Sequence, residues 1–298
     1  MPLFDRLGSW PRRPQHLPAV ARLSRVAMAD PSEFDVVEAI NVHMKDDAGA
    51  LRRVDKEKAQ AQWQALAIAY RRLGVELALL PALPGHPDFC FAANPSLVLP
   101  LPDGSREMWM SRMTHASRVG EVAAHRDFGK QVGLTIREMP AHVLRFEGTG
   151  DGILHPGRFL LHGGVSPRTS RAAWAALAQA HPEMDVLLYR MENPKYYHLD
   201  TALAPLDEKT ALIVPQAFET EGLEMVRAAF PRFFEVPPEE AALFAGNAHC
   251  PDGKHVLLQS GCKVTEAWLR ANGFEPVPLD TSEFLKSGGS VFCLKLAW

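Results

Sequence analysis

Five times along this chain, an amphipathic helical segment is followed by a glycine or proline and then by a short apolar segment. Apolar spacing predicts helices over residues 56–72, 121–131, 170–180, 219–230 and 264–272. The residues that follow them are Gly74, Gly133, His181-Pro182, Pro231 and Gly273. Glycine just past a helix end adopts a positive φ without strain, and proline cannot continue a helix, so these residues predict where each helix ends.

The apolar segments after the helices predict strands at residues 75–80, 134–139, 184–191, 232–237 and 274–279. Further strand-like runs lie at 25–30, 96–101, 107–113, 158–164, 210–215, 255–260 and 290–298. Each unit therefore contains one helix and about three strands. Five similar units favour a closed, radial α/β arrangement, and a generic open α/β sheet accounts for the same periodicity equally well.

Composition is that of an ordinary globular protein. Of the 298 residues, 47% are hydrophobic and 22% are charged, with a net charge of -3, so nothing suggests a nucleic-acid surface. No apolar run reaches the roughly 18 residues that a membrane span needs. Residues 1–22 lack the apolar core of a secretory signal. We expect residues 1–22 to be a flexible extension or an arm packed on an edge, followed by one domain over 23–298.

The cysteines are four: Cys90, Cys250, Cys262 and Cys293. None forms a Cys-x-x-Cys pair or a short Cys–His spacing, so we expect no metal site and no cofactor. A disulfide scaffold is unusual in a chain of this size, and reduced thiols in a cytoplasmic protein are the simplest reading. The question is whether one of these thiols is a nucleophile.

Polar residues beside apolar runs form the candidate site. They are Asp88 and Asn94 in PDFCFAAN, Glu147 and Asp151 in EGTGD, His198 and Asp200 in YYHLDT, and Cys293 in SVFCLKL. Each has an ordinary structural reading, because single histidines are commonly satisfied within a core and free cysteine is commonly buried. As a set they match the needs of one chemistry.

With these motifs in this order, the sequence resembles the superfamily of dimethylarginine dimethylaminohydrolases, arginine deiminases and amidinotransferases. It looks most similar to the bacterial branch that includes dimethylargininases and arginine dihydrolases. The resemblance covers nearly the whole chain after about residue 24 and rests on the segments FDVVEAINVHM, KAQAQWQAL, PDFCFAAN, SRMTHASRVGE, FEGTGD, PRTS, YYHLDT and SEFLKSGGSVFCLKL. It implies a single guanidino-modifying catalytic domain, built as a five-bladed α/β propeller of pseudo-symmetric ββαβ modules.

The implied chemistry explains the residue types. A guanidinium carbon is a poor electrophile because its charge is spread over three nitrogens, so attack needs a soft, strong nucleophile such as a thiolate. Carboxylates hold the cation through charge-assisted hydrogen bonds. A histidine delivers a proton to the departing amine and later takes one from water.

The resemblance assigns the roles. Cys293 is the nucleophile, His198 the general acid and base, and Glu147 supports both His198 and the guanidinium. Asp88 and Asn94 line the guanidinium pocket, while Asp151, Asp200 and Asn41 contact the substrate or support groups that do. Arg118 and Arg168 match arginines that bind the substrate's α-carboxylate, a task suited to their planar fork. The expected partner is a small guanidino molecule, and homo-oligomerisation is left open.

Departures from the branch lie near the substrate entrance. Ala92 stands where a threonine is common, and Asn41-Val42-His43-Met44 replaces Asn-Pro-Trp-Met. The expected activity is hydrolysis of arginine or a methylated arginine to citrulline. Alternatives are an amidinotransferase and a catalytically idle protein that binds arginine-like ligands. Asn94 adds a further hypothesis, because several superfamily members carry aspartate there whereas arginine dihydrolases carry asparagine: the enzyme takes arginine through to ornithine.

Overall fold

The computed structural model describes residues 2–298. All five predicted helices are confirmed, with their ends displaced by at most one residue. They are α1 (Lys56–Arg72), α2 (Glu121–Gln131), α4 (Arg171–Ala180), α5 (Thr220–Ala229) and α7 (Lys263–Ala271). Gly74 and Gly133 have φ values of +73° and +79°, so the predicted helix ends are indeed left-handed glycines.

Three sheets share one construction, in which an inner strand pairs antiparallel with a middle strand, and the middle strand pairs parallel with the strand that follows the helix. The first sheet contains β4 (Ser96–Pro100), β5 (Arg106–Met110) and β6 (Thr135–Glu138). The second contains β7 (Gly152–Leu154), β8 (Leu160–Val165) and β9 (Asp185–Arg190). The third contains β10 (Leu203–Pro205), β11 (Thr210–Ile213) and β12 (Arg232–Glu235).

The other two sheets complete the same pattern with segments from elsewhere. β13 (His255–Gln259) and β14 (Glu275–Leu279) pair in parallel, and an isolated bridge from His249 takes the inner position. β2 (Arg25–Ala29) and β3 (Glu76–Leu80) also pair in parallel, and β15 (Leu296–Ala297) at the C-terminus lies antiparallel to β2. The last strand of the chain, β15, thus completes the sheet of β2 and β3.

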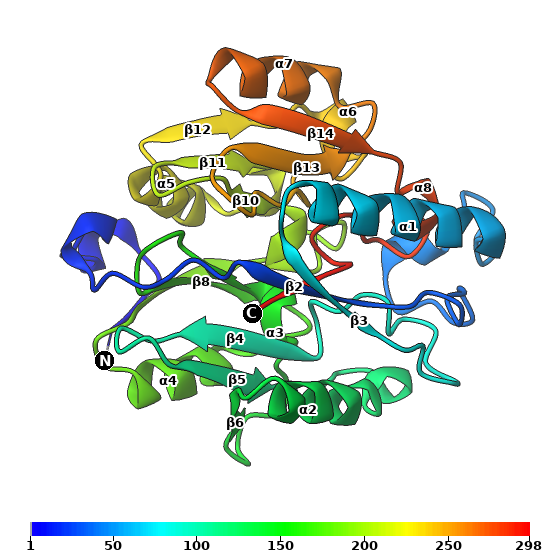
Figure 1. Ribbon diagram of the computed structural model, residues 1–298. Coiled ribbons are helices and arrows are strands. Elements are labelled where there is room, and N and C mark those ends of the chain that lie inside the picture. The colour runs from blue at the N-terminus through cyan, green and yellow to red at the C-terminus, as the bar shows by residue number, and fades with distance from the viewer. Residues whose placement is uncertain (1) are drawn as a thin grey trace.

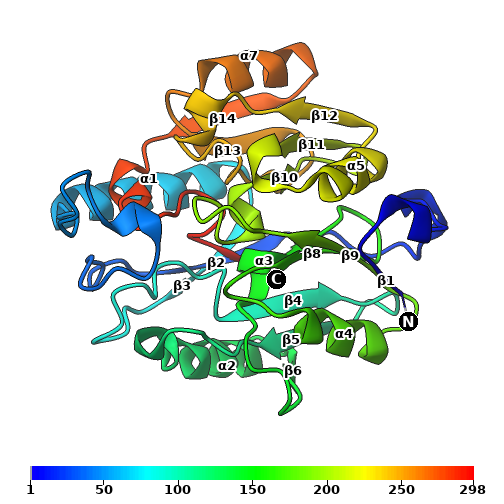
Figure 2. The same ribbon diagram turned by 180° about the vertical axis from the view of Figure 1, so that it is seen from behind.

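The protein is therefore a mixed α/β structure with five sheets. Helices α1, α2, α4 and α7 lie on the outside in both views, and the chain ends near the middle (Figures 1 and 2). Burial follows this arrangement: every residue of inner strand β4 is buried, whereas β6 on the outside has none buried. Strands buried on both faces are continuously apolar, which is why SLVLP reads as an uninterrupted apolar run.

Short helices occupy the connections between these elements. They are α3 (Gly148–Asp151), α6 (Pro238–Ala241), α8 (Ser282–Leu285) and the 3-10 turns Leu7–Ser9, Pro14–His16, Val42–Met44, Ala116–Arg118, Leu199–Thr201 and Pro215–Ala217. The prediction of a strand over 290–298 is wrong for most of that segment, because residues 291–294 form a turn and only β15 pairs. Cys293 therefore lies in a turn.

Of the two alternatives expected for residues 1–22, a flexible extension or an arm packed on an edge, the structure shows the packed arm over the residues described, and residue 1 lies outside them. β1 (Leu3–Phe4) pairs in parallel with β9. The Trp10 side chain is only 3% exposed, and its Nε1 donates to Asp185 Oδ2 at 2.9 Å. Arg12 forms an ion pair with the same carboxylate. A buried carboxylate needs such partners, so Asp185 holds the segment in place.

Within residues 2–298 there is no helix with the length and apolar character to cross a bilayer. Over the same range, no group of three or more histidine, cysteine, aspartate or glutamate side chains is arranged to hold a metal ion. All four cysteines are buried and unpaired.

The packed arm gives a stability prediction. Replacing Trp10 with alanine removes a buried ring and leaves Asp185 with one donor fewer, so we expect a loss of about 3–5 kcal/mol in the free energy of unfolding. Urea unfolding followed by circular dichroism measures it. Ser9→Ala, at an exposed neighbour, is the control and should change little. Equal stability of the two variants would mean that the arm is not anchored in solution.

Candidate active site

Six of the predicted site residues line one narrow cavity, named here the Cys293 cavity. They are Asn41, Asp88, Asn94, Arg118, Arg168 and Cys293, and the remaining lining includes Ile40, Met44, Phe91, Tyr197 and Ser287. These residues come from connections that are far apart in sequence, including the turn after β8 and the turn before β15. His198, Glu147 and Asp200 lie behind this lining and contact it.

Cys293 is held as a neutral thiol. It is 3% exposed, and its Sγ donates to Asp200 Oδ2 at 3.0 Å. Burial raises the thiol pKa well above its ordinary value, and the nearby Asp200 carboxylate raises it further. A buried thiolate beside a carboxylate is unfavourable, so ionisation requires an added positive charge.

Asn247, which the sequence did not single out, fixes the turn that carries the thiol. Its Oδ1 accepts from the backbone N–H groups of Ser290, Phe292 and Cys293 at 3.1–3.2 Å. Its Nδ2 approaches Cys293 Sγ at 3.1 Å and donates to the Asp200 carbonyl at 2.8 Å. Asparagine is frequent in ordinary turns, so nothing in the segment GNAHC marks this role.

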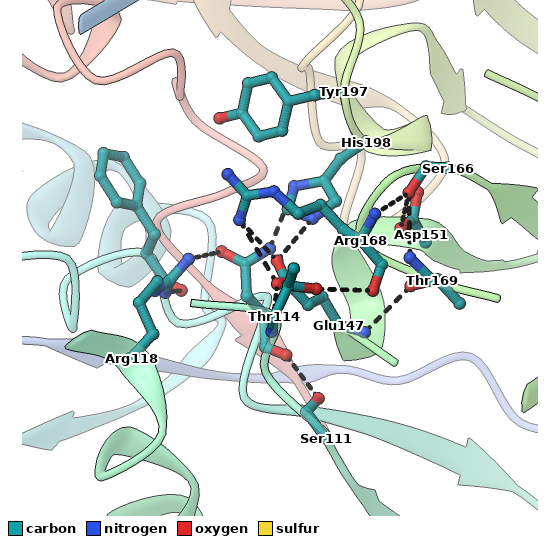
Figure 3. Close-up of polar contacts among 12 residues, drawn as sticks. Ser111, Thr114, Arg118, Glu147, Asp151, Ser166, Arg168, Thr169, Tyr197 and His198 are labelled. Atoms are coloured by element: carbon teal, nitrogen blue, oxygen red, sulfur yellow. Dashed lines mark hydrogen bonds and ion pairs between the residues drawn. The ribbon is translucent and has the colours of Figure 1, made fainter. Parts of the chain in front are cut away.

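Glu147 is the hub of the polar network (Figure 3). Its carboxylate accepts from His198 Nε2 at 2.9 Å, from Arg168 Nη1 at 3.0 Å and from the Thr114 N–H at 3.0 Å. Burial alone would raise the pKa of Glu147, but the hydrogen bond from His198 and the charge of Arg168 hold it well below its ordinary value. Glu147 is therefore a carboxylate, which stabilises a proton on His198 Nε2.

The orientation of Asn94 fixes the other nitrogen of His198. Arg118 Nη1, which can only donate, contacts Asn94 Oδ1 at 2.8 Å. The Asn94 Nδ2 group therefore faces His198 Nδ1, at 3.4 Å. With Nε2 donating to Glu147, neutral His198 presents an unprotonated Nδ1 toward Asn94 and the cavity side. This nitrogen is the one that can take and deliver a proton.

Arg118 is largely engaged within the protein. Its Nε and Nη2 bond the Glu121 carboxylate, and Nη2 also donates to the carbonyls of Asp88 and Phe91. With Nη1 bonded to Asn94, one of the five guanidinium N–H groups remains for a ligand. Arg118 as a carboxylate ligand stays a prediction, and in this conformation a bidentate Glu121 already occupies one edge of its fork.

Arg168 keeps more of its donors. It is 3% exposed, donates from Nη2 to the Ile40 carbonyl at 2.7 Å and lies 5.3 Å from the centre of the Tyr197 ring. Figure 3 shows Tyr197 beyond its guanidinium. Three of its N–H groups remain after the bonds to Glu147 and Ile40. Arg168 is thus the better placed of the two predicted carboxylate ligands.

Two further predicted residues serve the loops around the site. Asp151 is fully buried away from the cavity, where it accepts from Ser166 Oγ at 2.7 Å and from the Leu199 N–H at 3.1 Å. It anchors the His198 segment, in keeping with the supporting role that was one of the two expected for it. Asn41 does line the cavity, and its Nδ2 donates to the Ser287 carbonyl at 2.9 Å.

Two buried carboxylate oxygens at the site have no hydrogen-bond partner among the described residues: Asp88 Oδ1 and Asp200 Oδ1. Burial raises the pKa of Asp88, and it raises the pKa of Asp200 to about 6. Unpaired buried carboxylates are costly, and a bound cation with several N–H donors would satisfy both. The site therefore favours a cationic ligand.

Comparisons with known proteins agree on a family. A sequence model of N,N dimethylarginine dimethylhydrolase, eukaryotic, matches residues 30–296. The chain is 37% identical over 294 residues to the N(G),N(G)-dimethylarginine dimethylaminohydrolase of Mycobacterium tuberculosis, covering 98% of this chain and 89% of that protein. It is 29% identical to the bifunctional arginine dihydrolase/ornithine cyclodeaminase AgrE of Nostoc, covering 91% of this chain and 37% of that longer protein.

Among solved structures, the substrate-bound N-terminal domain of ArgZ, an arginine dihydrolase from cyanobacteria, superposes with a TM-score of 0.84. It is 27% identical, and the match covers 91% of this chain and 97% of that domain. The overall α/β arrangement is therefore shared with a guanidino-hydrolysing domain along almost its whole length.

The contacts of Asn247 give the prediction for this site. Asn247→Asp keeps the acceptor for three backbone N–H groups but places a carboxylate oxygen beside Cys293 Sγ. We expect the thiol pKa to rise by about one unit and alkylation of Cys293 by iodoacetamide to slow about tenfold at neutral pH. Mass spectrometry of the Cys293 peptide measures the rate.

Asn272→Asp at the end of α7 is the matched control. It adds the same charge away from the cavity and should leave the alkylation rate unchanged. If the two variants react at the same rate with intact circular dichroism, Asn247 does not set the reactivity of the thiol.

Proposed function

This chain belongs to the dimethylarginine dimethylaminohydrolase family, and from that premise we propose that it cleaves a terminal C–N bond in the guanidino group of arginine or a methylated arginine, through a covalent intermediate on Cys293. The observation that carries the proposal is a pair of unpartnered carboxylate oxygens, Asp88 Oδ1 and Asp200 Oδ1. Asp88 lines the cavity together with Cys293, and the other oxygen of Asp200 accepts from the Cys293 thiol. A planar guanidinium can donate to both at once.

Substrate binding supplies the charge that activates the nucleophile. The guanidinium, held by Asp88 and Asp200, places a positive charge beside Cys293 and lowers its pKa. The S–H proton already points at Asp200 Oδ2, which accepts it. An empty site therefore keeps a protonated, unreactive thiol, and an occupied site produces the thiolate.

The proposed reaction then proceeds in two halves. The Cys293 thiolate forms a bond to the guanidinium carbon, and the bond from that carbon to the departing nitrogen breaks as His198, in its imidazolium form, gives that nitrogen the proton on Nδ1. Water attacks the resulting amidino-thioether while His198 takes back a proton, and the C–S bond breaks. Glu147, bonded to His198 Nε2, stabilises the imidazolium form that both halves require. The products are citrulline and ammonia or a methylamine.

Arg168 binds the far end of the substrate in this proposal. Its free N–H groups face the cavity, and an α-carboxylate accepts such donors with matched geometry. Arg118, with one N–H left, can add a single hydrogen bond. The negative α-carboxylate and the positive guanidinium would thus lie at opposite ends of one pocket.

For the architecture, we propose that the five sheets form five blades of a propeller, with residues 23–298 as one catalytic domain. The repeated strand pattern and the completion of the β2–β3 sheet by β15 support this closure. The cytoplasm stays our proposed location, supported by four unpaired cysteines.

A second candidate is the full conversion of arginine to ornithine. Asn94 supports it, because its uncharged amide lines the cavity next to His198. A neutral ureido group would meet an amide there, and an amide tolerates a neutral ligand better than a carboxylate does. Citrulline could then remain for a second attack by Cys293.

Product analysis distinguishes these activities. We expect the purified protein to form citrulline from arginine or asymmetric dimethylarginine in water alone, and Cys293→Ser to reduce turnover roughly 10³-fold or more. Chromatography of ornithine, citrulline, ammonia and dimethylamine identifies the reaction. Ornithine from arginine establishes the dihydrolase, whereas turnover that depends on an added amine acceptor such as glycine establishes a transferase. Substrate binding without turnover would leave only the idle binding protein.

Arg168→Ala tests the far end of the pocket. We expect kcat/KM to fall about 10- to 100-fold more for arginine than for agmatine, which lacks the α-carboxylate, because a charge-assisted hydrogen bond is lost only with arginine. A smaller fall in kcat on both substrates is also expected, because Arg168 supports Glu147. Equal losses on the two substrates would remove Arg168 as a carboxylate ligand.

A further inference from the structure

The turn that carries Cys293 separates two cavities. Cys293 lines the cavity described above, whereas its neighbours Phe292 and Lys295 line a second one, named here the Lys295 cavity. The two cavities share no lining residue. The second cavity encloses about 690 Å³ including its open mouth, and residues of inner strands β4, β7, β10 and β15 and the bridging His249 contribute to its wall.

Lys295 is an unusual residue to find in this wall. Its side chain is 1% exposed, and its Nζ lies 3.3 Å from the centre of the Phe292 ring. Lys295 Nζ forms no hydrogen bond or ion pair within residues 2–298, so its polar interaction is the cation–π contact with the Phe292 ring. Burying an ammonium without an anion is costly, and a cation–π contact offsets only part of that cost.

The other polar groups of the Lys295 cavity favour an anion. Arg22 lines it, with its guanidinium bonded only to the carbonyls of Cys250 and Leu206. His249 lines it as well, and its Nδ1 is engaged by the Tyr70 hydroxyl at 2.8 Å. Burial holds the His249 pKa well below its ordinary value, so its ring is neutral and can donate from Nε2. No aspartate or glutamate is among the lining residues.

Thr149 and His155 also line the cavity, and most of the remaining wall is apolar, including Leu23, Leu97, Val98, Ile153 and Leu154. A free inorganic ion gains nothing from such a surface, whereas a small organic acid can place a hydrocarbon body against it. The wall therefore favours a ligand that has both an apolar hydrocarbon part and a negative charge.

We propose that the Lys295 cavity is a second binding site, distinct from the Cys293 cavity, which takes a small monocarboxylate whose carboxylate group meets the Lys295 ammonium and whose apolar body lies against the strands. Arg22 contributes a second positive charge near the mouth. The site requires no cofactor, and it requires nothing of the substrate-binding residues.

The pH dependence of binding follows from the groups around Lys295. On the side of the thiol these are Asp200 and Cys293, and on the cavity side they are Arg22, His155 and His249. Burial lowers the pKa of Lys295 to about 7, although Asp200 opposes this. Of the two forms of Lys295, only the ammonium attracts a carboxylate, so the contribution of Lys295 to binding is fully present below that pH and is lost as the pH rises through it.

Thermal unfolding with butyrate as the probe tests the site, because a ligand that binds only the folded state raises Tm. We expect butyrate to raise the Tm of the full chain, more at pH 6 than at pH 8, and 1-butanol at equal concentration to raise it much less. Lys295→Met removes the charge at similar volume and should abolish the butyrate shift. Lys263→Met, at a mostly exposed lysine, is the matched control and should retain it.

A second variant, Ala297→Leu, tests the site independently in case Lys295→Met does not fold. It fills the Lys295 cavity while leaving Lys295 in place. It should also reduce the shift. The proposal is overturned if butyrate does not stabilise the wild-type chain, if Lys295→Met with native circular dichroism keeps the full shift, or if butanol stabilises as much as butyrate does.

Discussion

Glu147 carries a negative charge where its side chain is fully buried, and the arrangement around the thiol depends on it. Three donors reach this carboxylate, from His198, Arg168 and the backbone of Thr114. Each donor belongs to a different connection between strands, so the Glu147 carboxylate holds three loops in fixed positions relative to one another. Removing the charge would leave a buried arginine without its counter-ion, which costs more than the loss of a surface ion pair. Catalytic geometry and local stability therefore rest on the same interaction.

The position of the nucleophile depends on a second, topological constraint. β15 pairs with β2 to complete the sheet of β2 and β3, so the last residues of the chain pass through the middle of the molecule. The turn with Cys293 lies immediately before that strand. Asn247 shapes the turn through three backbone N–H groups, so the thiol is fixed from the side of a neighbouring sheet. Convergence of distant segments follows from closing the chain, which explains why the candidate residues are scattered along the sequence.

Periodicity and helix-ending residues predicted the five long helices because these signals are local: Gly74 and Gly133 act through their own φ angles. The Cys293 turn was predicted wrongly, and the choice between an extension and a packed arm at the N-terminus stayed open, because long-range partners decide both: Asn247 for residues 290–293 and Asp185 for Trp10. Residue type and family resemblance nominated the polar set, and its members do gather around one cavity. Residue type and family resemblance could not predict which N–H donors stay free. Arg118 and Arg168 are the same type of residue, and each is engaged by a different carboxylate, Glu121 for Arg118 and Glu147 for Arg168.

The distribution of charge finally explains why the site selects a cation. Glu121 pairs with Arg118 and Glu147 with Arg168, so these four groups are balanced inside the protein. Asp88 and Asp200 remain, and neither forms an ion pair among the described residues, although Lys295 acts on Asp200 through its charge. Burial is the main cause of their raised pKa values, because desolvation disfavours the charged form of a carboxyl group. In the proposed reaction, a guanidinium would supply one positive charge between these two carboxylates. A neutral ligand of the same shape would leave two buried charges unpaired, so the deficit itself discriminates between a cationic guanidinium and a neutral ureido product.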